Sequence, residues 1–277
     1  MVKGEAVGRK IGFPTANLEL VKKTALKPGV YAALVTLKRQ NYLGLAYFGP
    51  RYIFGDKQNS FEVFIFNFKQ NIYGKKLTVK LLKFLRPPKA VKSLDGLKRL
   101  LIQDLTRLND QVVLVNKEDK ILGIEDKVKA HQGRAKLHRA ISVQLFNQKG
   151  ELLIQQRSKY KKLFPLIWAN TVCTDVRPYE TYLAAAERRL KEEIGLIAEL
   201  RPAFKFFYAA PSGKSGWERE VDQVFFGQVS GRPRPNPGEI ASWKYVSLKA
   251  AQARVKIFAP WFRLILKKIK PSDIFKT

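Results

Sequence analysis

The chain has 277 residues, 45% of them apolar, and a formal charge of +29 from 52 Lys and Arg residues against 23 Asp and Glu residues. This length favours two domains or one large one, and the absence of any run of about 18 apolar residues argues against a membrane span or membrane partner. The first residues lack the apolar core of a signal peptide, and a single cysteine excludes an internal disulfide, so we expect a cytoplasmic protein. The charge attracts anions in general, but the lysines are spread along the chain and no nucleic-acid recognition motif accompanies them.

Residues 1–109 predict a β-domain. The strand-like runs GVYAALVTL, YLGLAYF, SFEVFIFNF and KKLTVKLLKFL are separated by Gly, Pro, Asp and Asn turn signals. This spacing is typical of an antiparallel barrel or sandwich. The segment after them, SLDGLKRLLIQDLTRL, predicts one amphipathic helix with Ser93 as its N-cap.

The stretch GRKIGFPTANL, from Gly8 to Leu18, carries a possible phosphate-binding chemistry. Glycine lets backbone N–H groups approach phosphates, and the oxygens of Thr15 and Asn17 suit magnesium. The alternative is a polar turn capped by the same two side chains. Glu62, the acid of the apolar run SFEVFIF, is likewise either a solvent-facing strand residue or a base held in a pocket.

Together, GRKIGFPTAN, PGVYAA, FEVFIF, IYGKKLTVKLLKFLRP and SLDGL resemble the riboflavin kinase (flavokinase) domain over nearly all of residues 3–107. The resemblance implies a six-stranded antiparallel β-barrel with a C-terminal helix that transfers the γ-phosphoryl group of ATP to riboflavin, giving FMN. Glu62 would take the proton from the ribityl hydroxyl, and Thr15 and Asn17 would bind magnesium and the nucleotide phosphates. The other cofactor-binding positions that it implies are Gly8, Lys10 and Arg86, with Arg86 near the flavin.

Residues 111–277 predict a second, α/β domain. HRAISVQLFNQKGELLIQQRS is a hairpin by pattern, and FKFFYAA, VDQVFFGQV and SWKYVSL follow as strands, with a last helix in APWFRLILKKI. Between them lies a helix with Leu183, Ala186, Leu190 and Ile194 on one face and Gly195 as its C-terminal cap. Strands with interspersed helices indicate an α/β sandwich.

The residues able to carry acid–base or metal chemistry gather in this second domain. Cys173 is the only cysteine, and His131 and His138 are the only histidines. A carboxylate pair, Glu218 and Glu220, follows downstream. By themselves these residues leave two interpretations open, because free cysteines are usually buried and inert and lone histidines are usually structural.

RRLKEEIG resembles the Nudix box, in which carboxylates on a helix bring a divalent cation to a diphosphate. Without its context a Glu-Glu helix is more often a solvated face. Thr174 stands at the usual glycine of the box, and Arg189 stands where hydrolases carry a glutamate. These two differences argue against diphosphate hydrolysis.

LHRAISVQLFNQKGELLIQQRS, FPLIWANTVC, RRLKEEIG, FYAAPSG, EREVDQVF and FAPWFRLI together resemble type I isopentenyl-diphosphate isomerase, a Nudix-type fold, over about residues 112–268. The resemblance implies interconversion of isopentenyl and dimethylallyl diphosphates. Glu220 and Tyr208 would supply a proton to one face of the alkene, and Cys173 would remove one from the adjacent carbon. Trp261 would offer an aromatic face to the intervening carbocation.

The same resemblance implies a metal site. His131, His138, Glu218 and Glu220 match four of the family's ligands, and Asp175 takes the place of the third histidine. An aspartate ligates hard cations, so we expect magnesium or manganese and a lower affinity for zinc. A second magnesium would bridge Glu193 to the diphosphate. The substrate-binding cations implied are Lys127, Arg157, Lys161 and Arg189, with bidentate contacts expected from arginine.

The hypothesis from sequence is therefore a bifunctional enzyme with segments 1–109 and 111–277, using ATP and a divalent metal. Its substrates would be riboflavin, ATP and isopentenyl diphosphate. Two alternatives stay open: a Nudix pyrophosphohydrolase in the second half, and a basic nucleic-acid-associated protein whose catalytic sites have decayed.

Overall fold

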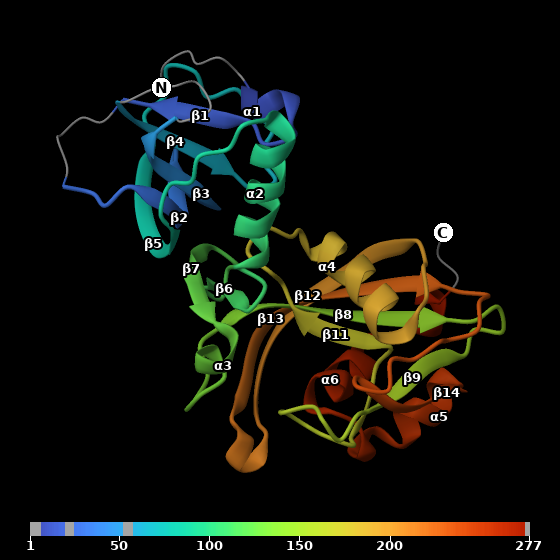
Figure 1. The fold of residues 1–277 in the computed structure, drawn as a ribbon. Coiled ribbons are helices and arrows are strands. Elements are labelled where there is room, and N and C mark those ends of the chain that lie inside the picture. Colours follow the sequence, from blue (N-terminus) through green and yellow to red (C-terminus); the bar gives the residue numbers. More distant parts are fainter. Residues whose placement is uncertain (1–6, 20–24, 52–57, 275–277) are drawn as a thin grey trace. The chain divides into compact units, whose positions relative to one another are not determined.

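The computed structural model of the chain describes residues 7–19, 25–51 and 58–274. The chain divides into two compact units, Met1–Asp126 with Arg177–Tyr179 (unit 1) and Lys127–Val176 with Glu180–Thr277 (unit 2) (Figure 1). In the part described, no helix is long and apolar enough to span a bilayer. The two-domain layout is thus seen, while the segment boundary near residue 110 stays a prediction.

Unit 1 is built on an antiparallel sheet, as its alternating runs predict. After the short helix α1 (Val7–Lys10), the strands are β1 (Thr15–Leu18), β2 (Gly29–Leu37), β3 (Gln40–Pro50), β4 (Asn59–Ile65) and β5 (Thr78–Arg86), in the order β1-β4-β3-β2-β5. Val35, Ala46 and Val63 belong to its apolar core. Thr15 and Asn17, which the sequence analysis considered as caps of a polar turn, lie instead in the strand β1, because the backbone there pairs with β4. The sheet has five strands within the described residues, so a closed six-stranded barrel stays a prediction.

The end of unit 1 also follows the sequence. Helix α2 (Leu94–Thr106) begins at Ser93, whose hydroxyl accepts a hydrogen bond from the Gly96 N–H at 3.1 Å, which confirms the predicted cap. β6 (Gln111–Val115) and β7 (Ile121–Asp126) then form an antiparallel pair, joined by a turn that includes residues 116–119 (NKED).

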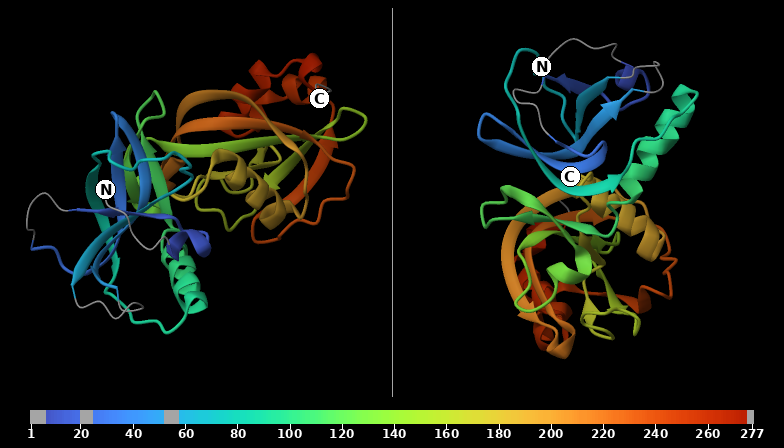
Figure 2. Two further views of the ribbon diagram at one scale, coloured as in Figure 1. Left: turned by 90° about the horizontal axis from the view of Figure 1, so that it is seen from above. Right: turned by 60° about the vertical axis from the view of Figure 1, so that its left-hand side comes forward.

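In unit 2, the short helix α3 (Lys127–Ala130) precedes the predicted hairpin of β8 (His138–Phe146) and β9 (Leu152–Arg157). β8 pairs with β11 (Val172–Asp175) and, in parallel, with β13 (Trp217–Gln228). β13 and β12 (Leu200–Pro211) form a long curved hairpin, clearest in Figure 2. β9 pairs with β10 (Trp168–Ala169) and β14 (Ile240–Val246).

Helices cover both faces of this sheet (Figure 1). α4 (Tyr182–Arg189) packs on the face that carries Ile141 and Val143. α6 (Pro260–Lys268) and α5 (Leu248–Ala253) pack on the opposite face, which carries Phe146 and Val224. Unit 2 is therefore the layered α/β sandwich that its sequence predicts. Single 3-10 turns lie at Gly213–Ser215, Val255–Ile257 and Pro271–Asp273.

Helix α4 continues into one π-helical turn, η2 (Leu190–Ile194), which ends at Gly195 in the left-handed region with φ 66°. Leu190 and Ile194 are buried as predicted, but Leu183 is 39% exposed, so its assignment to the buried face is wrong. The wider π turn accepts one extra residue per turn and leaves Glu193 only 1% exposed beneath the helix.

Candidate active sites

The strands of unit 2 bring the predicted acid, thiol and metal ligands to one face of the sheet. Side chains of directly paired residues point to the same side. Glu220 pairs with Tyr208 on one side and with His138 on the other. In β11, Asp175 pairs with Ala140 and Cys173 pairs with Ser142, so both side chains lie on the same face of the sheet as His138. Residues from four strands thus form one continuous surface on the side of α6.

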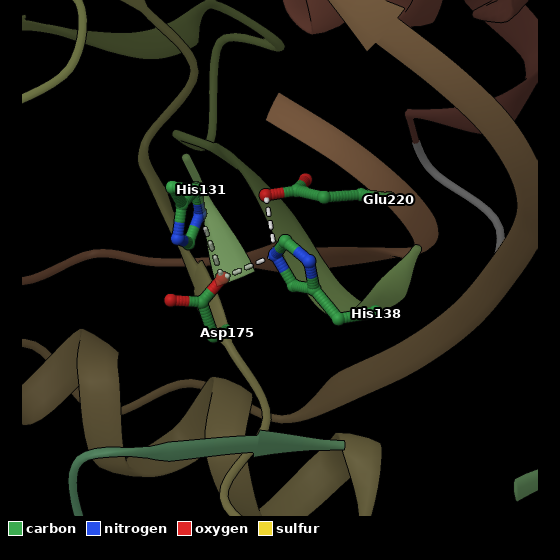
Figure 3. A group of neighbouring side chains, drawn as sticks. All are labelled: His131, His138, Asp175 and Glu220. Carbon is green, nitrogen blue, oxygen red and sulfur yellow. Dashed lines mark hydrogen bonds and ion pairs between the residues drawn. The ribbon is translucent and has the colours of Figure 1, made fainter. Parts of the chain in front are cut away.

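At one end of this surface, ligand atoms of His131, His138, Asp175 and Glu220 all lie within 4.8 Å of one another (Figure 3). Asp175 Oδ1 is 3.0 Å from His138 Nε2 and 3.8 Å from His131 Nε2. His138 Nε2 is also 3.7 Å from Glu220 Oε1, and His131 Nε2 is 3.1 Å from Glu218 Oε2. The five residues predicted as ligands therefore converge.

The hydrogen bonds of the two imidazoles show that this group requires a cation. His131 Nδ1 lies 2.7 Å from the carbonyl of Lys127, and His138 Nδ1 lies 2.7 Å from the carbonyl of Lys136. A carbonyl only accepts, so each Nδ1 carries the hydrogen. Each Nε2 then faces a carboxylate, and two lone pairs repel unless a proton or a metal ion lies between them. Imidazole and carboxylate donors in this arrangement fit a divalent metal.

Lys127 belongs to this end of the site. Its Nζ is 2.7 Å from Asp175 Oδ2, so the second carboxylate oxygen is occupied while Oδ1 faces the histidines. Burial opposes charge on Asp175, but the charge of Lys127 and the hydrogen bond from His138 hold the pKa of Asp175 well below its usual value. The predicted contact between Lys127 and a diphosphate stays a prediction.

Glu220 is held in an environment that favours its acid form. The Tyr208 hydroxyl donates to Glu220 Oε2 at 2.6 Å. Burial, followed by the charge of Glu218, raises the pKa of Glu220 well above its usual value. The pKa of Glu218 is lowered, because its hydrogen bond with His131 outweighs burial. The pKa values of the two glutamates are therefore shifted in opposite directions, down for Glu218 and up for Glu220.

The thiol lies farther along the same face. Cys173 is half-buried against the α6 core, which also contains Tyr208 and Trp261. Burial raises the pKa of Cys173 to about 12, and the nearby charge of Arg157 opposes this rise. Arg157 Nη1 donates to the sulfur at 3.6 Å, while its Nε and Nη2 donate to the carbonyls of Phe164 and Leu163.

The Trp261 ring lies near Arg157 and Tyr208, the hydrogen-bond partners of the thiol and of Glu220. Its centroid is 5.5 Å from the Arg157 guanidinium and 6.1 Å from the Tyr208 ring. The indole Nε1–H donates to Asn170 Oδ1 at 2.9 Å, and the Asn170 amide donates in turn to the carbonyls of Val143 and Val172. The indole orientation is therefore fixed to the sheet. Sequence reasoning missed Asn170, which only this three-dimensional contact reveals.

The remaining predicted cations form a separate cluster. Lys161 and Arg189 both contact the Glu193 carboxylate, with Lys161 Nζ at 3.3 Å from Oε1. Both also contact Glu239, which the sequence analysis did not single out. Lys161, Arg189 and Glu193 are thus brought together as predicted, and Arg157 is placed with the thiol instead.

In unit 1, a cavity of about 140 Å³ is lined by Gly8, Thr15, Glu62 and Arg86, with apolar side chains of α2 among its walls. Thr15 Oγ1 donates to Glu62 Oε2 at 3.0 Å. A side chain at Gly8 would meet the Phe13 carbonyl at 2.2 Å, so only glycine allows this turn. Four of the residues predicted for the flavin half therefore share one cavity.

Two other predicted residues of unit 1 lie beside this cavity rather than on its wall. Asn17 pairs with Glu62 across β1 and β4, and Lys10 is exposed at the end of α1. The sequence analysis missed Asp104, which is fully buried and binds Arg86 through two hydrogen bonds of 2.7 Å. This bidentate pair fixes the guanidinium between β5 and α2.

Comparison with known proteins assigns both halves. The family model for riboflavin kinase matches residues 1–112, and that for the NUDIX domain matches residues 136–267. Isopentenyl-diphosphate Delta-isomerase 2 of Aromatoleum aromaticum is 39% identical over 166 residues, covering 58% of this chain and 87% of that protein. The chain belongs to the isopentenyl-diphosphate isomerase family.

Another member, the chloroplastic isopentenyl-diphosphate Delta-isomerase I of Arabidopsis thaliana, is 37% identical over 194 residues, or 60% of this chain and 67% of that protein. Among solved structures, the MutT protein from Methanosarcina mazei matches 51% of this chain and 96% of its own length, with 20% identity and a TM-score of 0.43. By the two family-model matches and the isomerase relatives, the chain joins a riboflavin kinase domain to an isomerase domain of the Nudix superfamily.

Proposed function

We propose that the protein phosphorylates riboflavin to FMN with ATP in its N-terminal domain and isomerises isopentenyl diphosphate to dimethylallyl diphosphate in its C-terminal domain. The observation that carries the second activity is the shared sheet face: the Glu220 carboxyl, a thiol and an indole converge there beside a group of metal ligands. For the first activity it is the cavity that brings Glu62 and Thr15 together. The family's closed six-stranded barrel is part of this proposal.

The isomerisation is a balanced exchange of two protons without redox change. Glu220, hydrogen-bonded to Tyr208, gives its proton to the terminal carbon of the alkene. The resulting tertiary carbocation is stabilised by the face of Trp261. The Cys173 thiolate then removes a proton from the neighbouring carbon, which places the double bond there. A thiolate whose pKa is about 12 is a strong base, and Arg157 is the cation that favours its formation.

His131, His138, Asp175, Glu218 and Glu220 would hold one divalent cation, magnesium or manganese, since three of the five ligands are carboxylates. When bound, the cation would supply positive charge that compensates these carboxylates. Lys161 and Arg189 bind the diphosphate, and Glu193 would hold the magnesium ion that accompanies it.

In the N-terminal domain, Glu62 accepts the proton of the ribityl hydroxyl as that oxygen attacks the γ-phosphorus of ATP. Thr15 both orients Glu62 through its hydrogen bond and, with Asn17, offers oxygens to the magnesium ion of Mg-ATP. Gly8 lets the turn between α1 and β1 close onto Phe13. Arg86 supplies positive charge at the cavity wall.

Two matched variants test the assignment because each serves as the other's control. We expect Cys173→Ala to abolish formation of dimethylallyl diphosphate from isopentenyl diphosphate with Mg²⁺ or Mn²⁺, while FMN synthesis continues. Conversely, Glu62→Gln should abolish FMN synthesis from riboflavin and Mg-ATP while isomerisation continues. Unchanged isomerisation in Cys173→Ala, or phosphate release from the diphosphate in place of isomerisation, contradicts the proposal.

A further inference from the structure

The cations proposed to bind the diphosphate are already covered by two carboxylates of the protein. Arg189 Nη2 and Lys161 Nζ both contact Glu193, whose other oxygen accepts a hydrogen bond from Gln155 Nε2 at 3.2 Å. Arg189 Nη2 is also 3.3 Å from Glu239 Oε2, and Lys161 contacts the same oxygen. Two positive and two negative charges cancel, so an incoming anion meets a neutral cluster.

The carboxylates of Glu193 and Glu239 differ in how easily they can move away from Lys161 and Arg189. Glu193 is 1% exposed on η2 and accepts hydrogen bonds at both of its oxygens. The Glu239 side chain is 26% exposed and lies in the loop before β14. Its backbone is anchored separately, since the Ser158 N–H donates to its carbonyl at 2.9 Å. The Glu239 carboxylate can therefore turn away from the cations without disturbing the loop.

Arg189 keeps an unused donor at this position. Its Nε is buried and has no hydrogen-bond partner, whereas its other two nitrogens are bound to Glu192, Glu193 and Glu239. A buried donor without an acceptor carries a cost of about 1–3 kcal/mol. An oxygen atom of a ligand that binds next to Arg189 would relieve this cost.

We propose that the Glu239 carboxylate occupies the position of a phosphate group on Lys161 and Arg189, as an internal competitor that any phosphate or diphosphate must displace. This inference rests on the proposed isomerase function. A monophosphate replaces one anion by another and gains little. A diphosphate brings a second phosphate group and its magnesium ion, which contact Glu193 and compensate for the displacement.

The test measures anion binding without requiring turnover. The dissociation constants of inorganic phosphate and inorganic pyrophosphate are measured by calorimetry with the full chain, Mg²⁺ and about 0.15 M salt, which screens the general positive charge. Glu239→Gln keeps the side-chain size and removes the competing charge. We expect phosphate and pyrophosphate each to bind about fivefold tighter to Glu239→Gln than to the wild type, because both must displace the same carboxylate.

Glu192→Gln is the matched control. Glu192 contacts Arg188 and Arg189 but is 42% exposed and lies outside the pair of contacts to Lys161. Removing its charge should leave both dissociation constants within about twofold of the wild type, because Glu192 does not contact Lys161.

The outcomes separate the two hypotheses. Unchanged dissociation constants in Glu239→Gln, or weaker binding of phosphate, overturn the role of Glu239 and leave the isomerase proposal standing. Equal changes in Glu239→Gln and Glu192→Gln also overturn it, because they indicate a general charge effect. Wild-type protein that binds no pyrophosphate overturns both.

Discussion

Tyr208→Phe is the most direct test of the acid side of the isomerase site. The substitution removes one oxygen, the hydroxyl that donates to Glu220 Oε2 at 2.6 Å, and keeps the ring that packs near Trp261. While Glu220 carries its proton this bond is an ordinary one. When the proton leaves for the alkene, the bond becomes a charged one and strengthens, so its effect develops in the transition state.

The magnitude follows from this contact. A hydrogen bond to a charged group contributes about 1.5–3 kcal/mol. Since about 1.4 kcal/mol corresponds to a factor of ten, kcat should fall roughly 10- to 150-fold. KM for isopentenyl diphosphate should change little. The Tyr208 hydroxyl contacts Glu220 and not Arg189, which is proposed to bind the diphosphate.

The assay is steady-state isomerisation with Mg²⁺ or Mn²⁺, with Tyr245→Phe as the control. Tyr245 packs on the opposite, α4 side of the sheet, so its hydroxyl should contribute nothing to turnover. A kcat within twofold of the wild type would refute the reasoning, as would a loss confined to KM. Either result would mean that Glu220 releases its proton without help from the tyrosine.

Three further predictions concern the metal, the flavin half and the helix cap. Burial alone would lower the pKa of His131, but the hydrogen bond with Glu218 and the charge of Asp175 raise it to about 9. A metal must displace this proton, so apparent metal affinity should rise about tenfold per pH unit below pH 9, as titration with Mn²⁺ will show. The metal-free protein should lose stability between pH 6.5 and 9, since its folded state holds the proton more tightly than the unfolded chain. Asp104→Ala leaves the buried Arg86 unpaired, so it should lower the free energy of unfolding by about 3–5 kcal/mol and slow FMN synthesis, whereas Asp95→Ala on the same helix should do neither. Gly195→Ala should cost about 1–2 kcal/mol in urea denaturation, because the residue has φ 66° and its Cβ would lie 2.9 Å from the Arg234 carbonyl; a neutral effect would mean that the turn shifts freely.

Much of the fold could be predicted because its signals are local. The short apolar runs GVYAALVTL and QVVLV, rich in β-branched residues, indicate strands regardless of their partners, and Ser93 caps α2 through a hydrogen bond to a residue only three positions away. Leu183 was misassigned because it is the second residue of α4, where the helix is only beginning, and periodicity alone cannot tell that this first turn stays exposed.

The site was only partly predictable for the opposite reason. Cys173 and the two histidines could be singled out because their residue types are rare in this chain. Glu239 is one of many acids, and its importance comes from Lys161, 78 residues earlier, which the fold brings to it. Asp104 is similar: only its complete burial against Arg86 distinguishes it from the exposed acid of its own helix.

Strand β8 has no face left over for solvent. Its even-numbered residues, beginning with His138, lie on the sheet face that carries Cys173 and Glu220. Its odd-numbered residues Ile141, Val143 and Leu145 belong to the core under α4. Inserting or deleting a single residue would exchange these two sets. His138 would then enter the hydrophobic core under α4, and Ile141 would take a place among the metal-ligating residues. Substitutions along β8 therefore preserve the division between its two faces, whereas a change in its length does not.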